Sequence, residues 1–155
     1  MALFCCIYLC IQTVSAQVIE GNYAGIMHLA PKTLDRDSIP VVLEISRQND
    51  SAFRLVMIYD SAMTKDYLFI LGQNGIVLDE QNGILLPGAR FNQGYIFHYS
   101  VNERQYHTRY EWKNDSTLLF KLDYFSPADT IELDDMIIQG YHFKGRQYAI
   151  LRKID

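Results

Sequence analysis

The stretch that decides the fold is GYIFHYSVNERQYHTRYEWKNDSTLLFKLDY, residues 94–124. Within it, apolar and aromatic residues alternate with polar ones, which is the period-two pattern of strands whose sheet buries one face. The alternation breaks at Asn102-Glu103 and again at Asn114-Asp115-Ser116, and these residue types favour tight turns. The stretch therefore predicts three antiparallel strands joined by two hairpins.

The two hairpin loops fix a register in which the apolar stripes of the three strands share one face. A two-residue loop at Asn102-Glu103 places Tyr99 opposite Tyr106. At the second hairpin a three-residue loop places Trp112 opposite Leu118, whereas a two-residue loop would turn one stripe to the wrong face. The predicted inner face is rich in aromatic residues, namely Tyr95, Tyr99, Tyr106, Tyr110, Trp112 and Tyr124.

Similar short runs separated by turn signals extend along the rest of the chain. The expected strand cores are 21–29, 39–47, 52–59, 66–71, 76–79, 94–101, 105–112, 117–125, 136–143 and 146–153. Sequential hairpins in this number predict an all-β protein, either an antiparallel up-and-down barrel or a closed sandwich of about eight to ten strands.

The first sixteen residues carry no charge and contain a continuous apolar run over 3–11. Val14 and Ala16 fit the small-residue rule of a signal peptidase site, so we expect a signal peptide over 1–16 and a single barrel domain over 17–155. The apolar run is too short to span a bilayer. The protein is therefore expected to be exported, to the periplasm or the medium; the alternative is a buried N-terminal element.

Composition narrows the function classes. Hydrophobic residues make up 49% and charged residues 21% of the 155, which is typical of a globular chain. The net charge of −4 gives no electrostatic footprint for nucleic acid. Because Cys5, Cys6 and Cys10 all precede the expected cleavage site, the mature chain would contain no disulfide and no thiolate nucleophile or ligand.

Two short segments resemble the lipocalin and fatty-acid-binding-protein group of barrels. They are GNYAG at 21–25, similar to the Gly-x-aromatic opening of the first lipocalin strand, and RQYAILR at 146–152 near the C-terminus. The resemblance implies a cup-shaped site for an apolar small molecule. It also implies that a late arginine, Arg152 or Arg146, packs over the opening aromatic residue, Tyr23.

The alternation in the last strand leads to the same expectation. Tyr148, Ile150 and Arg152 share one face, and if that face is the core, Arg152 points inward. An aromatic ring and backbone carbonyls can accommodate a buried guanidinium. We therefore expect Arg152 to pack over Tyr23 and close the barrel; the alternative is a solvated terminal side chain.

The six aromatic residues of the predicted inner face have three interpretations. They could line a ligand cavity, offering flat faces and hydroxyl groups. They could be exposed as a platform for a protein or a glycan. They could also form an ordinary core face whose phenol groups reach water at the barrel rim.

No motif for catalysis or metal binding stands out. The register places His98 opposite His107, but two imidazoles on the polar face of a hairpin do not make a zinc site. Carboxylates cluster at Asp129, Glu132 and 134–135 without the glycine of a calcium loop. Ser100 lies two residues from His98 on the same strand face, where an exposed hydroxyl is the simpler interpretation. The sequence predicts no enzyme, no metal and no cofactor.

Several turns carry tripeptides that resemble glycosylation acceptors. Asn49-Asp50-Ser51 and Asn114-Asp115-Ser116 match the N-linked pattern. Asp followed by Ser or Thr at positions 37, 50, 60, 115 and 129 resembles the acceptors of a bacterial O-linked system. Asp-Ser is equally good turn chemistry, so both interpretations stay open.

These observations do not identify a ligand or a reaction. The function expected from them is non-catalytic binding of an apolar or amphipathic small molecule within the barrel. The alternative is an envelope-associated structural or protein-interaction domain with a filled core. A cavity smaller than roughly 300 Å³ would favour the alternative.

Overall fold

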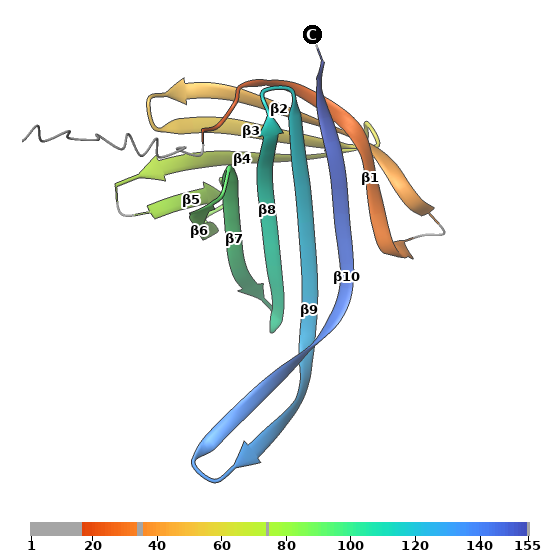
Figure 1. Cartoon of the computed structure of the whole chain (residues 1–155), viewed down its shortest axis with the longest axis vertical. Helices are drawn as coiled ribbons and strands as arrows, with labels where there is room; N and C mark the ends of the chain where they lie inside the picture. The colour runs from red at the N-terminus through yellow and green to blue at the C-terminus, as the bar shows by residue number, and fades with distance from the viewer. Residues whose placement is uncertain (1–16, 34–35, 74, 155) are drawn as a thin grey trace, which may run out of the picture.

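The computed structural model describes residues 17–33, 36–73 and 75–154, and these ranges form one closed antiparallel barrel (Figure 1). The predicted signal peptide over 1–16 lies outside the described residues. Each strand pairs with its neighbours in the sequence, and the first pairs with the last. The strands are β1 (Gly21–Thr33), β2 (Arg36–Asn49), β3 (Ala52–Tyr59), β4 (Met63–Gly72), β5 (Gly75–Asp79), β6 (Leu85–Phe91), β7 (Gly94–Val101), β8 (Arg104–Asn114), β9 (Thr117–Leu133) and β10 (Met136–Ile154). The all-β, up-and-down prediction is confirmed, in its barrel form.

In the part of the chain that the structure describes, no helix is long and apolar enough to cross a membrane.

The register predicted from the two hairpin loops is confirmed. Tyr99 pairs with Tyr106 across the β7–β8 hairpin, and Trp112 pairs with Leu118 across the next one. The second turn differs in detail, because Asn114 pairs with Thr117 and the register shifts between Trp112 and Asn114. A two-residue loop with an adjacent bulge therefore replaces the expected three-residue loop, and the aromatic stripes still share one face.

Three differences from the expected strands have local causes. β6 was not expected, because Pro87 and Gly88 interrupt any apolar alternation in it. Residues 136–143 and 146–153 form one strand, since the Lys144-Gly145 pair is part of a bulge and not a turn. Gly145 leaves room for Tyr124 there, because a Cβ would lie 2.5 Å from the far end of the Tyr124 side chain, which would have to shift. β9 also continues eight residues beyond its expected end, to Leu133.

One half of the barrel is filled by a tightly packed aromatic core. Phe69 lies edge-on to Tyr95, with ring centroids 4.7 Å apart, and to Phe97 at 5.7 Å. Tyr23 is completely buried; its hydroxyl donates to the carbonyl of Ile19 at 2.9 Å and accepts from Nε1 of Trp112 at 3.3 Å. This end of the barrel is closed by side chains from β1 and β8.

The expected contact between Arg152 and Tyr23 is wrong. The inner face of β10 carries Ala149 and Leu151, both completely buried, whereas Ile150 is 56% exposed. Arg152 therefore lies exposed on the outer face, and Arg146 pairs instead with Asp123. The contact that Tyr23 makes instead is with Trp112, whose Nε1 donates a hydrogen bond to its hydroxyl.

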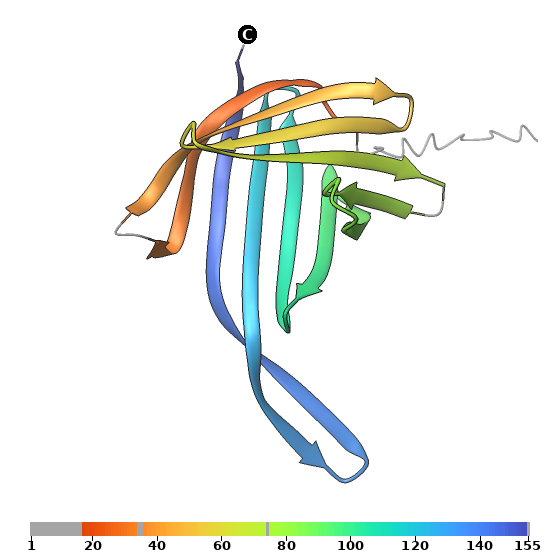
Figure 2. The same cartoon turned by 180° about the vertical axis from the view of Figure 1, so that it is seen from behind.

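β9 and β10 continue past the other, open end of the barrel as a long twisted hairpin (Figure 2). β8 pairs with β9 only as far as Phe125, and β1 pairs with β10 only from Arg146 onward. We call the remaining part of the hairpin, residues 126–143, the arm.

Candidate ligand-binding cavity at the barrel mouth

The open end of the barrel contains a cavity of about 780 Å³. It lies where the loops β1–β2, β3–β4 and β5–β6 meet, on the same end as the arm. Apolar, aromatic and charged side chains from seven strands and two of these loops line it. The lining residues are Leu29, Arg36, Ile39, Tyr59, Asp60, Ala62, Met63, Lys65, Tyr67, Glu80, Tyr99, Leu122 and Gln147.

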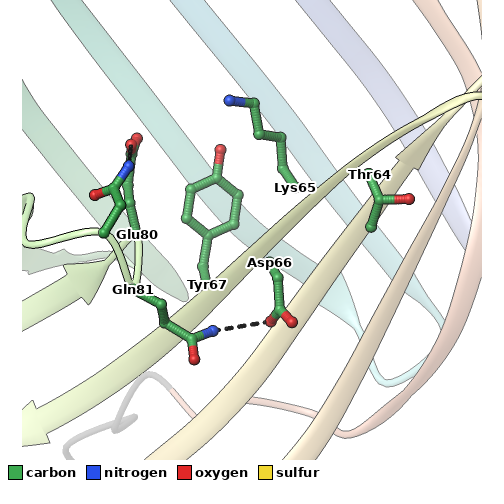
Figure 3. Close-up of a pocket in the computed structure, with 7 residues that line it drawn as sticks. Thr64, Lys65, Asp66, Tyr67, Glu80 and Gln81 are labelled. Atoms are coloured by element: carbon green, nitrogen blue, oxygen red, sulfur yellow. Dashed lines mark hydrogen bonds between the residues drawn. The ribbon is translucent and has the colours of Figure 1, made fainter.

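The pleat of β4 turns an unusual set of residues toward the cavity. Tyr67 pairs with Leu55, and Lys65 pairs with Met57, both of which are buried core residues. Figure 3 shows Lys65, Tyr67 and Glu80 extending to one side of β4, while Asp66 extends to the other. A lysine thus occupies an inward-facing position at the rim, where its stem lies along apolar surface.

Asp66 belongs to a separate network on the outer surface. Its carboxylate pairs with Arg54 at 2.6 Å and accepts from the side-chain amide of Gln81 at 3.0 Å. The hydrogen bond from Arg54 is the main cause that lowers the pKa of Asp66. The polar groove beside this network, about 310 Å³, is lined by residues on both sides of β4, including Thr64 and Asn82.

The charged groups of the cavity differ in how they are paired. Arg36 forms an ion pair with Asp60 across the rim. Glu80 accepts a hydrogen bond of 3.3 Å from Asn82. The side chain of Lys65 forms no ion pair or hydrogen bond with any of the described residues. The ammonium group of Lys65 is therefore available to a molecule in the mouth.

Three tyrosines supply hydroxyl groups to the cavity. A tyrosine phenol is protonated at neutral pH and can donate a hydrogen bond, and burial raises the pKa of Tyr59, Tyr67 and Tyr99 further. The ring of Tyr99 also stacks on Tyr106, with centroids 5.3 Å apart and planes within 9°. Tyr106 in turn lies 6.3 Å from Tyr124, which continues the stack toward the arm.

The six aromatic residues expected to contact a ligand divide into three groups. Tyr99 lines the cavity. Tyr106 and Tyr124 are half-buried beside it. The other three, Tyr95, Tyr110 and Trp112, are at most 3% exposed and belong to the filled core. These three residues are therefore part of the hydrophobic core in the structure.

Sequence reasoning missed Tyr59, Tyr67 and Lys65 as cavity residues. A signal was present for Tyr67, because Tyr67, Phe69 and Leu71 alternate along one strand face. The alternation shows which side chains point inward, but it does not show which end of the barrel stays open. That depends on the packing of all ten strands.

His98 and His107 lie across from each other as expected, on the outer face of the barrel. Their ring centroids are 4.0 Å apart with planes at 67°. Burial, followed by repulsion from His98, lowers the pKa of His107. The neighbouring carboxylate of Asp123 pairs with Lys121 at 2.8 Å and Arg146 at 2.6 Å. No group of three metal-ligating side chains occurs in the described ranges.

The remaining sequence candidates lie on the surface. Ser100 is exposed on the outer face of β7, like His98. Both Asn-Asp-Ser tripeptides form turns in which Oδ1 of Asn49 or Asn114 accepts hydrogen bonds from the backbone and hydroxyl of the serine. The turn interpretation of these tripeptides is confirmed, and their modification stays a prediction.

No protein-family model, curated protein or solved structure matches this chain.

Proposed function

We propose that this protein binds an amphipathic small molecule in the mouth of its barrel, without catalysing a reaction on it. The cavity of about 780 Å³ carries this proposal, because it exceeds the roughly 300 Å³ that a typical small ligand needs. Its mixed lining also fits a molecule with an apolar part and a polar end.

The lining suggests how such a molecule would lie. Leu29, Ile39 and Leu122 offer apolar surface below the rim, where the ligand's hydrocarbon part would be removed from water. Lys65 and the Tyr67 hydroxyl lie together near the rim, where they would bind a polar or anionic group. Arg36 is already neutralised by Asp60 and would contribute mainly to the shape of the rim.

Export is part of the same proposal and rests on the sequence of residues 1–16. The relationship to the lipocalin group is also proposed, supported by the closed antiparallel barrel and by the two short segments that resemble that group. A disulfide-free exported barrel must rely on its core, and the filled half of this barrel provides one.

The filled half of the barrel also favours a second candidate function. A domain that needed no ligand could use its aromatic core for stability alone and present its outer surface or arm to a protein. In that case the mouth of the barrel would simply be filled with solvent. A side chain that blocked the mouth would then have no effect on binding of the protein partner.

Titration with 1-anilinonaphthalene-8-sulfonate, an amphipathic anion that fluoresces in apolar surroundings, separates the two functions. The variant Leu122→Trp fills the cavity, whereas Leu119→Trp adds the same ring on the outer face of β9 as a matched control. We expect Leu122→Trp to abolish saturable binding, Lys65→Gln to weaken it about tenfold and Leu119→Trp to leave it unchanged. Equal binding by Leu122→Trp and the parent protein would contradict the proposal.

A further inference from the structure

The arm has one face that is almost entirely apolar at its tip. Ile131 pairs with Ile138, and Leu133 pairs with Met136, so these four side chains lie together on one side of the hairpin. They are between 47% and 61% exposed, and no element of the described fold covers them. An exposed cluster of this kind marks an interaction surface more often than chance.

The opposite face of the arm has a different composition. Thr130 donates a hydrogen bond of 2.9 Å to the side chain of Gln139, its cross-strand partner, and Glu132 pairs with Ile137. Polar groups therefore interrupt the apolar residues on this side. Matched substitutions on the two faces of the arm can therefore be compared with each other.

Charge is distributed unevenly along the arm. Residues 126–143 contain four carboxylates, Asp129, Glu132, Asp134 and Asp135, and no lysine or arginine. The base of the arm is basic, because Arg104 begins the strand beside it and Lys144 directly follows it. None of these six side chains forms an ion pair within the described residues. The acidic tip and the basic base are each without a partner in the monomer.

We propose that two copies of this chain associate through their arms, which lie antiparallel with the apolar faces in contact. In this arrangement the acidic tip of one arm lies against the basic base of the other, and the two acidic tips are kept apart. A two-fold axis produces both contacts at once, as self-complementary dimer interfaces require. A parallel arrangement would bring eight carboxylates together and is disfavoured.

The dimensions of the arm are sufficient for such an interface. Eight residues per strand give a length of about 26 Å at about 3.3 Å per residue. If about eight residues in each arm, the four apolar ones and about four that flank them, each lose about 80 Å² of exposed surface, the two copies together bury roughly 1,300 Å². That area lies at the lower end of the range for stable protein complexes. We therefore expect a dimer with a dissociation constant in the micromolar range, about 1–50 μM.

Sedimentation velocity of the purified protein from about 1 to 200 μM measures this association directly. The variant Leu133→Ser/Met136→Ser removes apolar contacts at the tip, and each substitution occurs twice in a symmetric dimer. We expect the dissociation constant to rise about 100-fold. The matched control is Ile137→Ser/Tyr141→Ser, which makes two comparable changes on the other face and should change the constant less than about threefold.

Charge reversal tests the antiparallel arrangement. Asp134→Lys/Asp135→Lys should weaken the dimer about tenfold, and adding Arg104→Glu/Lys144→Glu to the same chain should restore most of the affinity. All of these side chains are exposed, so the far-ultraviolet circular dichroism of each variant should match that of the parent protein.

Three results would overturn the proposal. The first is a protein that stays monomeric at every concentration. This result would overturn the proposal even if the arm bound neutral phosphatidylcholine vesicles or another protein. The second is a dimer that the two face variants weaken equally. The third is a dimer in which the second charge reversal weakens association further, since that result would require a different arrangement of the arms.

Discussion

Replacing Tyr23 by phenylalanine tests how the closed end of the barrel is held together. The substitution keeps the buried ring and removes the hydroxyl, which donates to the Ile19 carbonyl at 2.9 Å and accepts from Trp112 at 3.3 Å. Two polar groups then lose their partner in a site where Tyr23 itself is completely buried. The cost of leaving buried groups unpaired is about 1–3 kcal/mol each, and the longer bond contributes least. We expect a total loss of about 2–3 kcal/mol.

Urea unfolding followed by circular dichroism measures this loss. With an m-value of about 2 kcal/mol/M, the midpoint should fall by about 1 M while the m-value stays constant. Tyr148→Phe is the matched control, because Tyr148 is 39% exposed on the outer face of β10 and stacks on His28 through its ring. It should unfold within about 0.5 kcal/mol of the parent protein.

A double-mutant cycle with Trp112→Phe identifies the contact responsible. The two substitutions should couple by about 0.5–1.5 kcal/mol, because each one removes the same hydrogen bond. If Tyr23→Phe is as stable as the parent protein, or if the two changes add without coupling, the Tyr23 hydroxyl does not tie β1 to β8.

Three further predictions concern pH and packing. Burial raises the pKa of Tyr59, Tyr67 and Tyr110, so their contribution to the free energy of unfolding should stay constant below pH 10 and be lost as the pH rises above it. Absorbance at 295 nm should show these phenols ionising only as the circular dichroism is lost, and independent ionisation near pH 10 in the folded protein would contradict this. Gly94→Ala should lower the free energy of unfolding by about 3 kcal/mol or more, because a Cβ there would lie 2.0 Å from the carbonyl oxygen of Tyr110. The control is Gly140→Ala, where the nearest atom to a Cβ lies at 3.3 Å, and it should cost less than about 1 kcal/mol in the same urea assay. Equal midpoints would show that β7 and β8 separate at little cost. Burial and repulsion from His98 lower the pKa of His107, so His98→Asn should raise this pKa in a titration followed by nuclear magnetic resonance. An unchanged midpoint would assign the shift to burial alone.

The central part of the fold could be predicted because alternation and turn chemistry agree there. Between Gly94 and Tyr124, each apolar stripe allows one register, and the structure has the same pairs. The last strand lacked this agreement, since Tyr148 and Ile150 on one face compete with Ala149 and Leu151 on the other. Tyr148 and Ile150 suggested the core, yet Ala149 and Leu151 are the residues that the structure buries.

The arm and the cavity depend on relations that a single sequence does not contain. Lys144-Gly145 has the composition of a turn, but the strand passes through it because Gly145 allows the Tyr124 ring to pack closely. The actual turn lies at Asp134-Asp135, inside a group of carboxylates that could equally form a loop. Likewise, the side chain of a lysine in a strand normally points outward into solvent. Only the closure of the barrel places Lys65 at the mouth.

The most direct test of the proposed function is native mass spectrometry of the protein purified from its own host. We predict a population that carries an additional mass of a few hundred daltons, released on denaturation and absent from the Leu122→Trp variant. The Leu119→Trp variant should retain it. A parent protein whose native mass equals its polypeptide mass, or an added mass that survives in Leu122→Trp, would contradict ligand binding in the barrel mouth.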